Sequence, residues 1–168
     1  RNKIRNILLA LEGILDVYKM VNYALQQLYL NDKYNLIIRT HPLLPWNKIQ
    51  SRINFDINKL SNVSVSSNPN ILDDLSNADG CLYWGSTVAC EALNMGLPVI
   101  HFDINGVLNY DPLFELKNFK WIVRENDSLE NVILQINSLS DDEYEYQIGE
   151  AKKYIGKYFH PVTENNLN

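Results

Sequence analysis

Short apolar runs alternate with helix-like segments along almost the whole chain, and this alternation restricts the possible folds more than any other feature. The apolar runs lie at residues 4–11, 34–42, 62–67, 81–84, 98–102 and 120–125. Helical periodicity or helix-start signals mark residues 14–28, 45–52, 71–78, 87–95, 128–138 and 141–158. Short apolar runs separated by helices are typical of parallel strands, which are buried on both faces. The sequence therefore predicts an α/β fold, a Rossmann-like doubly wound parallel six-stranded sheet with helices on both faces.

Size, charge and cysteine content narrow the class of protein further. A chain of 168 residues that is 46% hydrophobic has the size of one globular domain, and residues 1–168 contain no linker-like segment. The formal net charge of -5 argues against a nucleic-acid partner, because nucleic-acid binding normally requires a basic surface. Cys81 and Cys90 form neither a disulfide framework nor a zinc motif, so we expect reduced core residues. No apolar run reaches the roughly 20 residues of a membrane span, and we expect a cytoplasmic protein.

In a doubly wound sheet, ligands bind outside the carboxyl ends of the strands. The loops that follow the predicted strands are residues 12–13, 39–42, 66–70, 85–87 and 103–111. We therefore expect the functional residues in these loops and at the start of the helices that follow them.

The turn Gly85-Ser86-Thr87 follows the fourth predicted strand and opens a helix. Ser86 is a favoured N-cap residue, and a first helical turn presents unpaired backbone N–H groups and the positive end of the helix dipole. Such a turn can bind phosphate, because Gly85 allows close approach and the Ser86 and Thr87 hydroxyls can donate to phosphate oxygens. A helix cap without a ligand is the alternative interpretation of the same turn.

Glu91 lies four residues after Thr87, on the same face of the predicted helix. The opposite, core-facing side carries Val88, Ala92 and Met95. One helical turn is about 5.4 Å, so the Glu91 carboxylate is poorly placed to bind the phosphate itself. It can accept hydrogen bonds from the ribose of a nucleotide whose phosphates lie at the helix start. A solvated acid favoured by the helix dipole is the alternative.

The segment CEALNMGLPVI, residues 90–100, resembles a segment in the C-terminal nucleotide-binding domain of GT-B glycosyltransferases. The resemblance implies that Glu91 binds the nucleotide ribose and that residues 85–87 bind the diphosphate, together with Gly13 after the first strand. It also implies an enzyme that needs no metal and no other cofactor, and the sequence shows no metal-ligand constellation. Many retaining members carry a second glutamate eight positions earlier, where this chain has Tyr83, so the resemblance does not extend to that subgroup.

A second segment, RTHPLLP at residues 39–45, resembles GT-B enzymes that build bacterial capsules and other surface polysaccharides. It is also similar to the CDP-glycerol phosphotransferases of teichoic-acid synthesis, whose pattern of two hydroxyl residues and a following acid is matched by residues 86–91. Chemically, Arg39 or His41 can neutralise the charge that grows on a leaving nucleotide phosphate. The alternatives are a surface ion pair for Arg39 and a packing or strand-end role for His41.

Other residues give weaker signals. Asn70 follows the third predicted strand and is expected to border the nucleotide base, with a plain loop as the alternative. Asp103 follows the fifth strand and can hydrogen-bond a donor-sugar hydroxyl or act as a structural cap. His101 lies within that strand and is expected in the core. The acidic residues at 73–74 and 141–143 are expected to complement helix dipoles.

The leading hypothesis is the nucleotide-sugar-binding half of a bacterial GT-B glycosyltransferase of surface-polysaccharide synthesis. Its donor is a nucleotide-sugar, while the glycan or lipid-linked acceptor and the catalytic base are expected to come from an N-terminal domain outside this chain. The chain alone is therefore expected to be inactive, and a peripheral association of the full-length protein with the cytoplasmic membrane face is compatible with this role. The alternatives are a CDP-polyol phosphotransferase, a UDP-sugar epimerase and a Rossmann-like module without catalysis.

Overall fold

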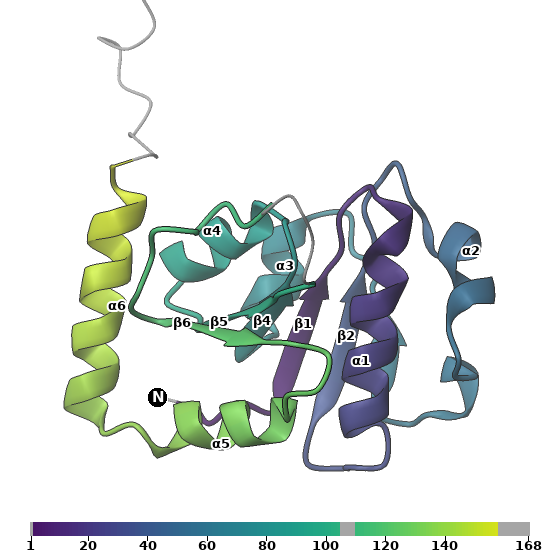
Figure 1. The fold of residues 1–168 in the computed structure, drawn as a ribbon, viewed down its shortest axis with the longest axis horizontal. Coiled ribbons are helices and arrows are strands. Elements are labelled where there is room, and N and C mark those ends of the chain that lie inside the picture. The colour runs from purple at the N-terminus through teal and green to yellow at the C-terminus, as the bar shows by residue number, and fades with distance from the viewer. Residues whose placement is uncertain (1, 105–109, 158–168) are drawn as a thin grey trace, which may run out of the picture.

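Six parallel strands form one sheet in the computed structural model, which describes residues 2–104 and 110–157. The order across the sheet is β3-β2-β1-β4-β5-β6, and every pairing is parallel. The first half of the chain extends the sheet outward from β1, and the second half extends it in the other direction from β4 (Figure 1). The strand order therefore reverses between β1 and β4. The predicted doubly wound, Rossmann-like α/β fold is confirmed.

The strands lie where the apolar runs predicted them: β4 is shifted by one residue toward the N-terminus, and the other five are shorter than predicted. They are β1 (Asn6–Ala10), β2 (Asn35–Arg39), β3 (Val63–Val65), β4 (Gly80–Tyr83), β5 (Val99–Phe102) and β6 (Lys120–Val123). The central strands are buried on both faces, which explains why they are unbroken apolar runs in the sequence. The edge strands differ: β3 is partly exposed along its length, and Ile122 of β6 is exposed.

The helices cover both faces of the sheet. They are α1 (Tyr18–Leu28), α2 (Trp46–Ile49), α3 (Ile71–Ser76), α4 (Val88–Asn94), α5 (Leu129–Ser138) and α6 (Asp141–Ile155), with 3-10 turns η1 (Leu15–Val17), η2 (Gln50–Arg52) and η3 (Ile57–Lys59). Right-handed crossovers place the helices after β1 and β4 on opposite faces, because these two connections run in opposite directions along the sheet. Figure 1 shows α1 in front of the sheet, with α3 and α4 behind it. No helix within residues 2–104 and 110–157 combines the length and apolarity that crossing a bilayer would need.

The helix predicted at residues 87–95 is α4, and its end confirms one prediction and corrects another. The helix ends close to the predicted residue 95, and Gly96, which follows, has φ +79, a left-handed conformation that glycine adopts without a steric penalty. The prediction that Met95 faces the core is wrong, because its side chain is 42% exposed. The buried side of α4 is formed instead by four residues in the middle of the helix, Ala89, Cys90, Ala92 and Leu93.

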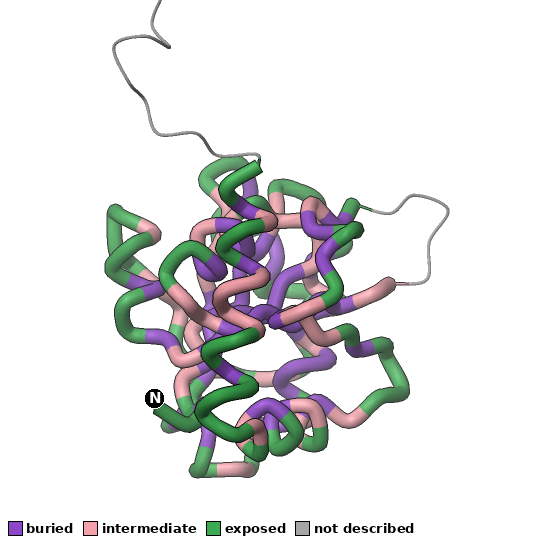
Figure 2. The backbone as a smooth tube through the Cα atoms, turned by 90° about the vertical axis from the view of Figure 1, so that its left-hand side faces the viewer, coloured by how far each residue is buried: buried purple, intermediate pink, exposed green. Residues whose placement is uncertain are grey.

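The core lies between the sheet and its two helical layers. Figure 2 shows buried segments through the centre of the molecule and exposed segments on its outer side. Cys81 and Cys90 are both buried, unpaired thiols, and His101 is buried in β5, as predicted. The rings of Tyr23 in α1 and Phe102 in β5 pack with their centroids 4.8 Å apart, which joins α1 to the second half of the sheet.

The acidic run at the start of α6 has its predicted role. Asp141, Asp142 and Glu143 occupy the first turn, where their charges complement the helix dipole. Ser140 and Glu143 also form a capping box, in which each side chain bonds the backbone of the other residue.

Candidate functional site

The loops that follow the central strands meet at the carboxyl edge of the sheet, where the strand order reverses. Because β1 lies between β2 and β4, the residues that follow these three strands are neighbours in space. They include Gly13, His41 and the turn at residues 85–87. This edge is the usual ligand position in doubly wound sheets.

Gly13 and His41 are in contact at this edge. A Cβ atom added at Gly13 would lie 3.0 Å from His41 Nδ1, so glycine leaves room for the imidazole. His41 Nδ1 accepts a hydrogen bond from the Leu43 backbone N–H at 3.2 Å. The His41 carbonyl accepts a second one, from the Leu44 N–H at 2.9 Å. A neutral imidazole whose Nδ1 accepts a hydrogen bond carries its proton on Nε2, so His41 can donate from Nε2 to a ligand oxygen.

The turn at residues 85–87 opens α4, but the cap lies one residue later than predicted. Thr87 occupies the N-cap position, and its side chain makes no capping hydrogen bond. Ser86 still contributes, because its Oγ accepts a hydrogen bond from the Val88 N–H at 3.4 Å. Thr87 is exposed, so its hydroxyl is open to a ligand.

Gly85 packs closely against Tyr110, which belongs to the chain segment before β6. A Cβ atom at Gly85 would lie 2.8 Å from Tyr110 Cβ and 3.0 Å from the Tyr110 carbonyl oxygen. The Trp84 and Tyr110 rings meet edge to face, with their centroids 6.0 Å apart. Close approach of two chain segments therefore explains the glycine, in addition to any approach of a phosphate.

Glu12 is the residue at this edge that the sequence analysis did not single out. Its carboxylate accepts a hydrogen bond from the Gly85 backbone N–H. Burial raises the pKa of Glu12 above its ordinary value of 4.5, and hydrogen bonds from the backbone N–H groups of Gly85, Trp84 and Ser86 act in the opposite direction. The sequence showed an acid at a strand end, but its partner lies in another loop, and only the fold brings the two together.

Glu91 lies in the first turn of α4 and is half-buried. Within the described part of the chain, its carboxylate has no hydrogen bond or ion pair. A partly exposed carboxylate one helical turn beyond the 85–87 turn remains free to accept hydrogen bonds from a ligand.

Arg39 does not form the surface ion pair that the sequence offered as an alternative. Its Nη1 lies 2.8 Å from Asp74 Oδ2, and the Asp74 side chain is only 2% exposed. Nη1 also donates to the Asn68 carbonyl at 2.5 Å, and Nη2 donates to the Pro69 carbonyl at 3.3 Å. The Ser66 hydroxyl donates to the same Asp74 carboxylate at 2.7 Å. Arg39 thus joins β2 to α3 and to the loop after β3.

Asn70 and Asp103, the other predicted ligand contacts, both have partners within the protein. Asn70 is the N-cap of α3, and its Oδ1 accepts a hydrogen bond from the Leu72 N–H at 3.0 Å. Asp103 Oδ2 accepts a hydrogen bond from Arg124 Nε at 3.1 Å at the carboxyl ends of β5 and β6. The rest of the predicted loop 103–111 lies partly outside the described residues.

A buried polar network, which no sequence pattern predicted, lies beneath α4. Tyr83 donates from its hydroxyl to Asp111 Oδ1 at 2.7 Å, and Lys120 Nζ donates to Asp111 Oδ2 at 2.8 Å. His101 Nδ1 lies 3.9 Å from the same oxygen. Burial alone would raise the pKa of Asp111, but the hydrogen bonds from Lys120, Tyr83 and the Leu113 N–H hold it below its ordinary value of 3.8. Tyr83 is therefore an internal hydrogen-bond donor.

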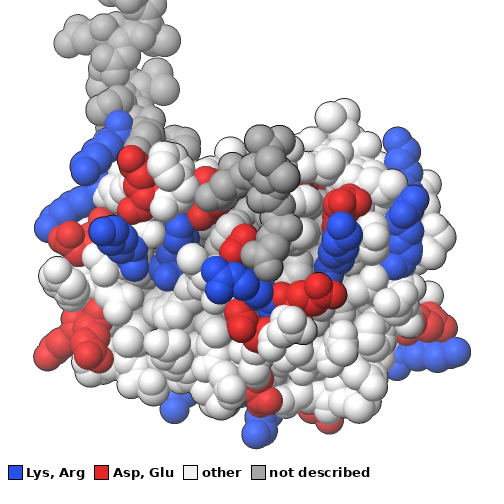
Figure 3. Space-filling view, in the orientation of Figure 1, with Lys and Arg blue, Asp and Glu red and all other residues white. Residues whose placement is uncertain are grey.

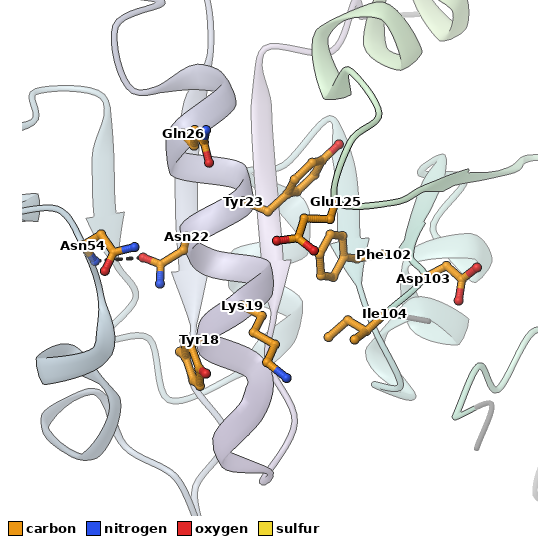
Figure 4. Close-up of a pocket in the computed structure, with 10 residues that line it drawn as sticks. All are labelled: Tyr18, Lys19, Asn22, Tyr23, Gln26, Asn54, Phe102, Asp103, Ile104 and Glu125. Carbon is orange, nitrogen blue, oxygen red and sulfur yellow. Dashed lines mark hydrogen bonds between the residues drawn. The ribbon is translucent and has the colours of Figure 1, made fainter. Parts of the chain in front are cut away.

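A cavity of about 470 Å³ lies beside α1, near the carboxyl ends of β5 and β6 (Figure 4). The residues that line it are Tyr18, Lys19, Asn22, Tyr23, Gln26, Asn54, Phe102, Asp103, Ile104 and Glu125. Several of its polar groups bond within the protein: Asn22 bonds both Arg52 and Asn54, and the Tyr23 hydroxyl donates to the Asp127 carbonyl. On the face shown in Figure 3, Lys and Arg side chains are interspersed with Asp and Glu.

Within residues 2–104 and 110–157, no three His, Cys, Asp or Glu side chains gather into a possible metal site. The expectation of an enzyme without a metal or other cofactor stays a prediction.

Solved structures with the same fold come from carbohydrate-active proteins. The glycotransferase of kitacinnamycin matches with a TM-score of 0.58 and 14% identity over 89% of this chain and 40% of that chain. Sucrose-phosphate synthase from Thermosynechococcus elongatus matches with a TM-score of 0.61 and 18% identity over 94% and 42%. The UDP-GlcNAc 2-epimerase from Neisseria meningitidis bound to UDP-GlcNAc matches with a TM-score of 0.52 and 19% identity over 94% and 44%.

The chain thus spans less than half the length of each of these three proteins. No protein-family model matches the sequence, and neither does any curated protein. At these identities the likeness establishes the fold alone.

Proposed function

We propose that the chain is the donor-binding domain of a glycosyltransferase, which transfers a sugar from a nucleotide-sugar to a surface-polysaccharide acceptor. One observation carries the proposal: three segments meet where the strand order reverses, and they contain Gly13, His41, and the 85–87 turn with Glu91 in the helix that follows it. The fold likeness to a glycotransferase, a sucrose-phosphate synthase and a UDP-GlcNAc 2-epimerase supports a nucleotide-sugar ligand.

The residues suggest a division of roles along such a ligand. The diphosphate contacts the backbone and hydroxyls of residues 85–87 beside Gly13, and Glu91 accepts hydrogen bonds from the ribose. His41 donates from Nε2 to the leaving phosphate and so stabilises the charge that grows there. Asp103 contacts the donor sugar. For this contact, the Asp103 carboxylate exchanges its hydrogen bond from Arg124 for one from a sugar hydroxyl.

The structure changes the role that we propose for Arg39. Its guanidinium already binds Asp74 and two carbonyl groups of the loop after β3. We therefore assign Arg39 to positioning this loop, which would border the nucleotide base next to Asn70. His41 is left as the single candidate of the two for the leaving phosphate.

The remaining parts of the proposed reaction lie outside this chain. The acceptor, a glycan or a lipid-linked glycan, and the catalytic base belong to an N-terminal domain, so the 168-residue chain binds the donor without transferring its sugar. We further propose a bacterial, cytoplasmic enzyme whose full-length form can work at the membrane face.

Calorimetric titration with UDP, GDP, CDP and CMP tests the proposal. The wild-type chain is expected to bind at least one nucleoside diphosphate, and Glu91→Ala should weaken this binding about tenfold or more, because it removes a charged acceptor of hydrogen bonds. Glu145→Ala, which removes an exposed carboxylate on α6, serves as the matched control and should bind like wild type. Equal affinity of Glu91→Ala and wild type would remove the ribose contact from the proposal.

The products formed by the full-length protein separate the alternatives. A glycosyltransferase releases a nucleotide only when acceptor is present. A CDP-polyol phosphotransferase releases CMP, and a UDP-sugar epimerase changes the sugar without any acceptor.

A further inference from the structure

The Gly85 backbone N–H, in the turn at residues 84–86, already donates to a carboxylate of the protein. The Glu12 carboxylate accepts the Gly85 N–H and lies close enough to Trp84 and Ser86 for their N–H groups to stabilise its charge. Two of these residues, Gly85 and Ser86, belong to the 85–87 turn whose backbone the proposed function assigns to the diphosphate. Glu12 directly follows the β1 region, and Gly13, the next residue, contacts His41. The carboxylate therefore lies within the proposed ligand site.

The Glu12 carboxylate is held there by one of its two oxygens. Oε1 has the Gly85 donor, whereas Oε2 is buried and has no hydrogen-bond partner among the described residues. A buried carboxylate oxygen without a donor is unfavourable, so this side chain is not fully stabilised where it lies. A ligand with more acceptor oxygens can use the same donors better.

We propose that Glu12 is an internal competitor of the nucleotide phosphate, and that its carboxylate must leave the 84–86 turn before the phosphate can bind there. This inference rests on the proposed function. A phosphate and a carboxylate carry like charges and cannot share one set of donors. Binding of the donor is thus coupled to a movement of the Glu12 side chain.

Within residues 2–104 and 110–157, no Lys, Arg or His side chain forms an ion pair with Glu12. Cys81 of β4 is a buried thiol whose pKa is raised to about 12 by burial and by Glu12 itself, so it is uncharged. Arg39, at the end of the neighbouring strand β2, is bound to Asp74. His41 lies beside Gly13, the residue after Glu12, and can donate a hydrogen bond to a phosphate oxygen.

Glu12→Gln and Glu12→Ala test the proposal in the 168-residue chain, with UDP and inorganic pyrophosphate as separate probes. The glutamine variant keeps the shape and removes the charge, and the alanine variant removes the side chain. The dissociation constant for UDP is expected to fall by about tenfold or more in both, because a charged competitor for hydrogen bonds is lost. Glu145→Gln on α6 makes the same change of net charge at an exposed site and should leave the dissociation constant unchanged.

The Gly85 amide resonance gives a readout that does not depend on any ligand. It is expected to shift in Glu12→Gln relative to wild type and to stay in place in Glu145→Gln, while the rest of the spectrum shows that the variants are folded. An unmoved Gly85 resonance would overturn the contact on which the inference rests.

The two probes separate this inference from the proposed function. Tighter pyrophosphate binding by the Glu12 variants, without UDP binding by any form, supports the inference and contradicts the proposed function. If the Glu12 variants bind UDP with the same affinity as wild type or more weakly, the proposed function stands and the inference is overturned. No binding of either probe by any form overturns both, because a vacated turn should accept pyrophosphate.

Discussion

At the scale of single residues, the contact between Gly13 and His41 is the clearest link between sequence and site. Both residues were predicted in loops after neighbouring strands, and the fold brings them so close that a Cβ atom at Gly13 would lie 3.0 Å from His41 Nδ1. Their contact depends on the missing side chain at Gly13, whose φ is not positive, so the glycine is needed for space and not for its backbone conformation.

The variant Gly13→Ala tests this contact. The new methyl group would lie 3.0 Å from His41 Nδ1, which is tighter than an ordinary contact, so the imidazole is expected to move and to lose its hydrogen bond from Leu43. NMR of the imidazole nitrogens should show the change, with little effect on stability. Gly149→Ala is the control, because nothing lies within 4 Å of a Cβ there, and it should stabilise α6 by about 0.5–1 kcal/mol. An unchanged His41 spectrum in Gly13→Ala would contradict the contact.

The environment of His101 allows a prediction of how the free energy of unfolding depends on pH. Burial lowers the pKa of His101 below its ordinary value of 6.5. The hydrogen bonds that Asp111 accepts lower the pKa of this carboxyl group below its ordinary value of 3.8. A group whose pKa is lower in the folded than in the unfolded protein stabilises the fold at pH values above its pKa in the unfolded protein. This stabilisation is lost as the pH falls through the pKa of the group in the folded protein. The free energy of unfolding should therefore fall as the pH drops below about 6.5, the ordinary histidine pKa, and again near the carboxyl range.

The variant His101→Phe isolates the histidine contribution. It keeps an aromatic ring against Tyr83 and removes the group that titrates, so urea denaturation should show a flatter pH dependence between neutral and mildly acidic pH. A pH dependence as steep as that of wild type would assign the effect to other groups.

At the scale of elements, the strands and helices were predictable because each follows from local periodicity. The side-chain bonds between elements were not. Arg39 shows why: its partner Asp74 lies in α3, and nothing in the spacing of the two residues marks them as a buried pair. The same holds for Glu12 and the turn before α4, whose contact depends on the pairing of β1 with β4. Sequence patterns predicted a candidate site at this edge of the sheet, whereas only the fold shows which side chains bond one another there.

Arg39→Met is expected to destabilise the chain by about 3–5 kcal/mol, because the Asp74 carboxylate stays buried without its cation. The double variant Arg39→Met with Asp74→Asn should recover part of this loss, since the uncompensated charge is gone. Urea denaturation of the three proteins measures both effects. If Arg39→Met changed the free energy of unfolding by less than about 1 kcal/mol, which is the range of an exposed ion pair, the result would contradict a buried Arg39–Asp74 pair.

The network beneath α4 gives a parallel prediction for β4, β5 and β6. Asp111→Asn should lower the free energy of unfolding by about 3–5 kcal/mol, because Lys120 is only 5% exposed and loses its counter-charge. Asp111→Asn combined with Lys120→Met should cost less than the single change. If the single and double variants were equally stable, the ion pair would not be the source of the effect.

At the scale of the whole molecule, the reversal of strand order between β1 and β4 determines where a ligand can lie. It places the loops after β1, β2 and β4 side by side, and these loops hold most of the residues that the sequence singled out. Asp103, by contrast, lies farther along the sheet after β5, beside the cavity of Figure 4. The central claim is that one nucleotide lies across the edge from Gly13 to Glu91.

Backbone amide shifts on titration with UDP and GDP test this claim most directly. The account predicts that the amides of Gly13, His41, Gly85 to Val88 and Glu91 move together with one binding curve, while those of β3 and α5 stay in place. A response confined to the residues of the cavity beside α1, or no response at millimolar nucleotide, would contradict it.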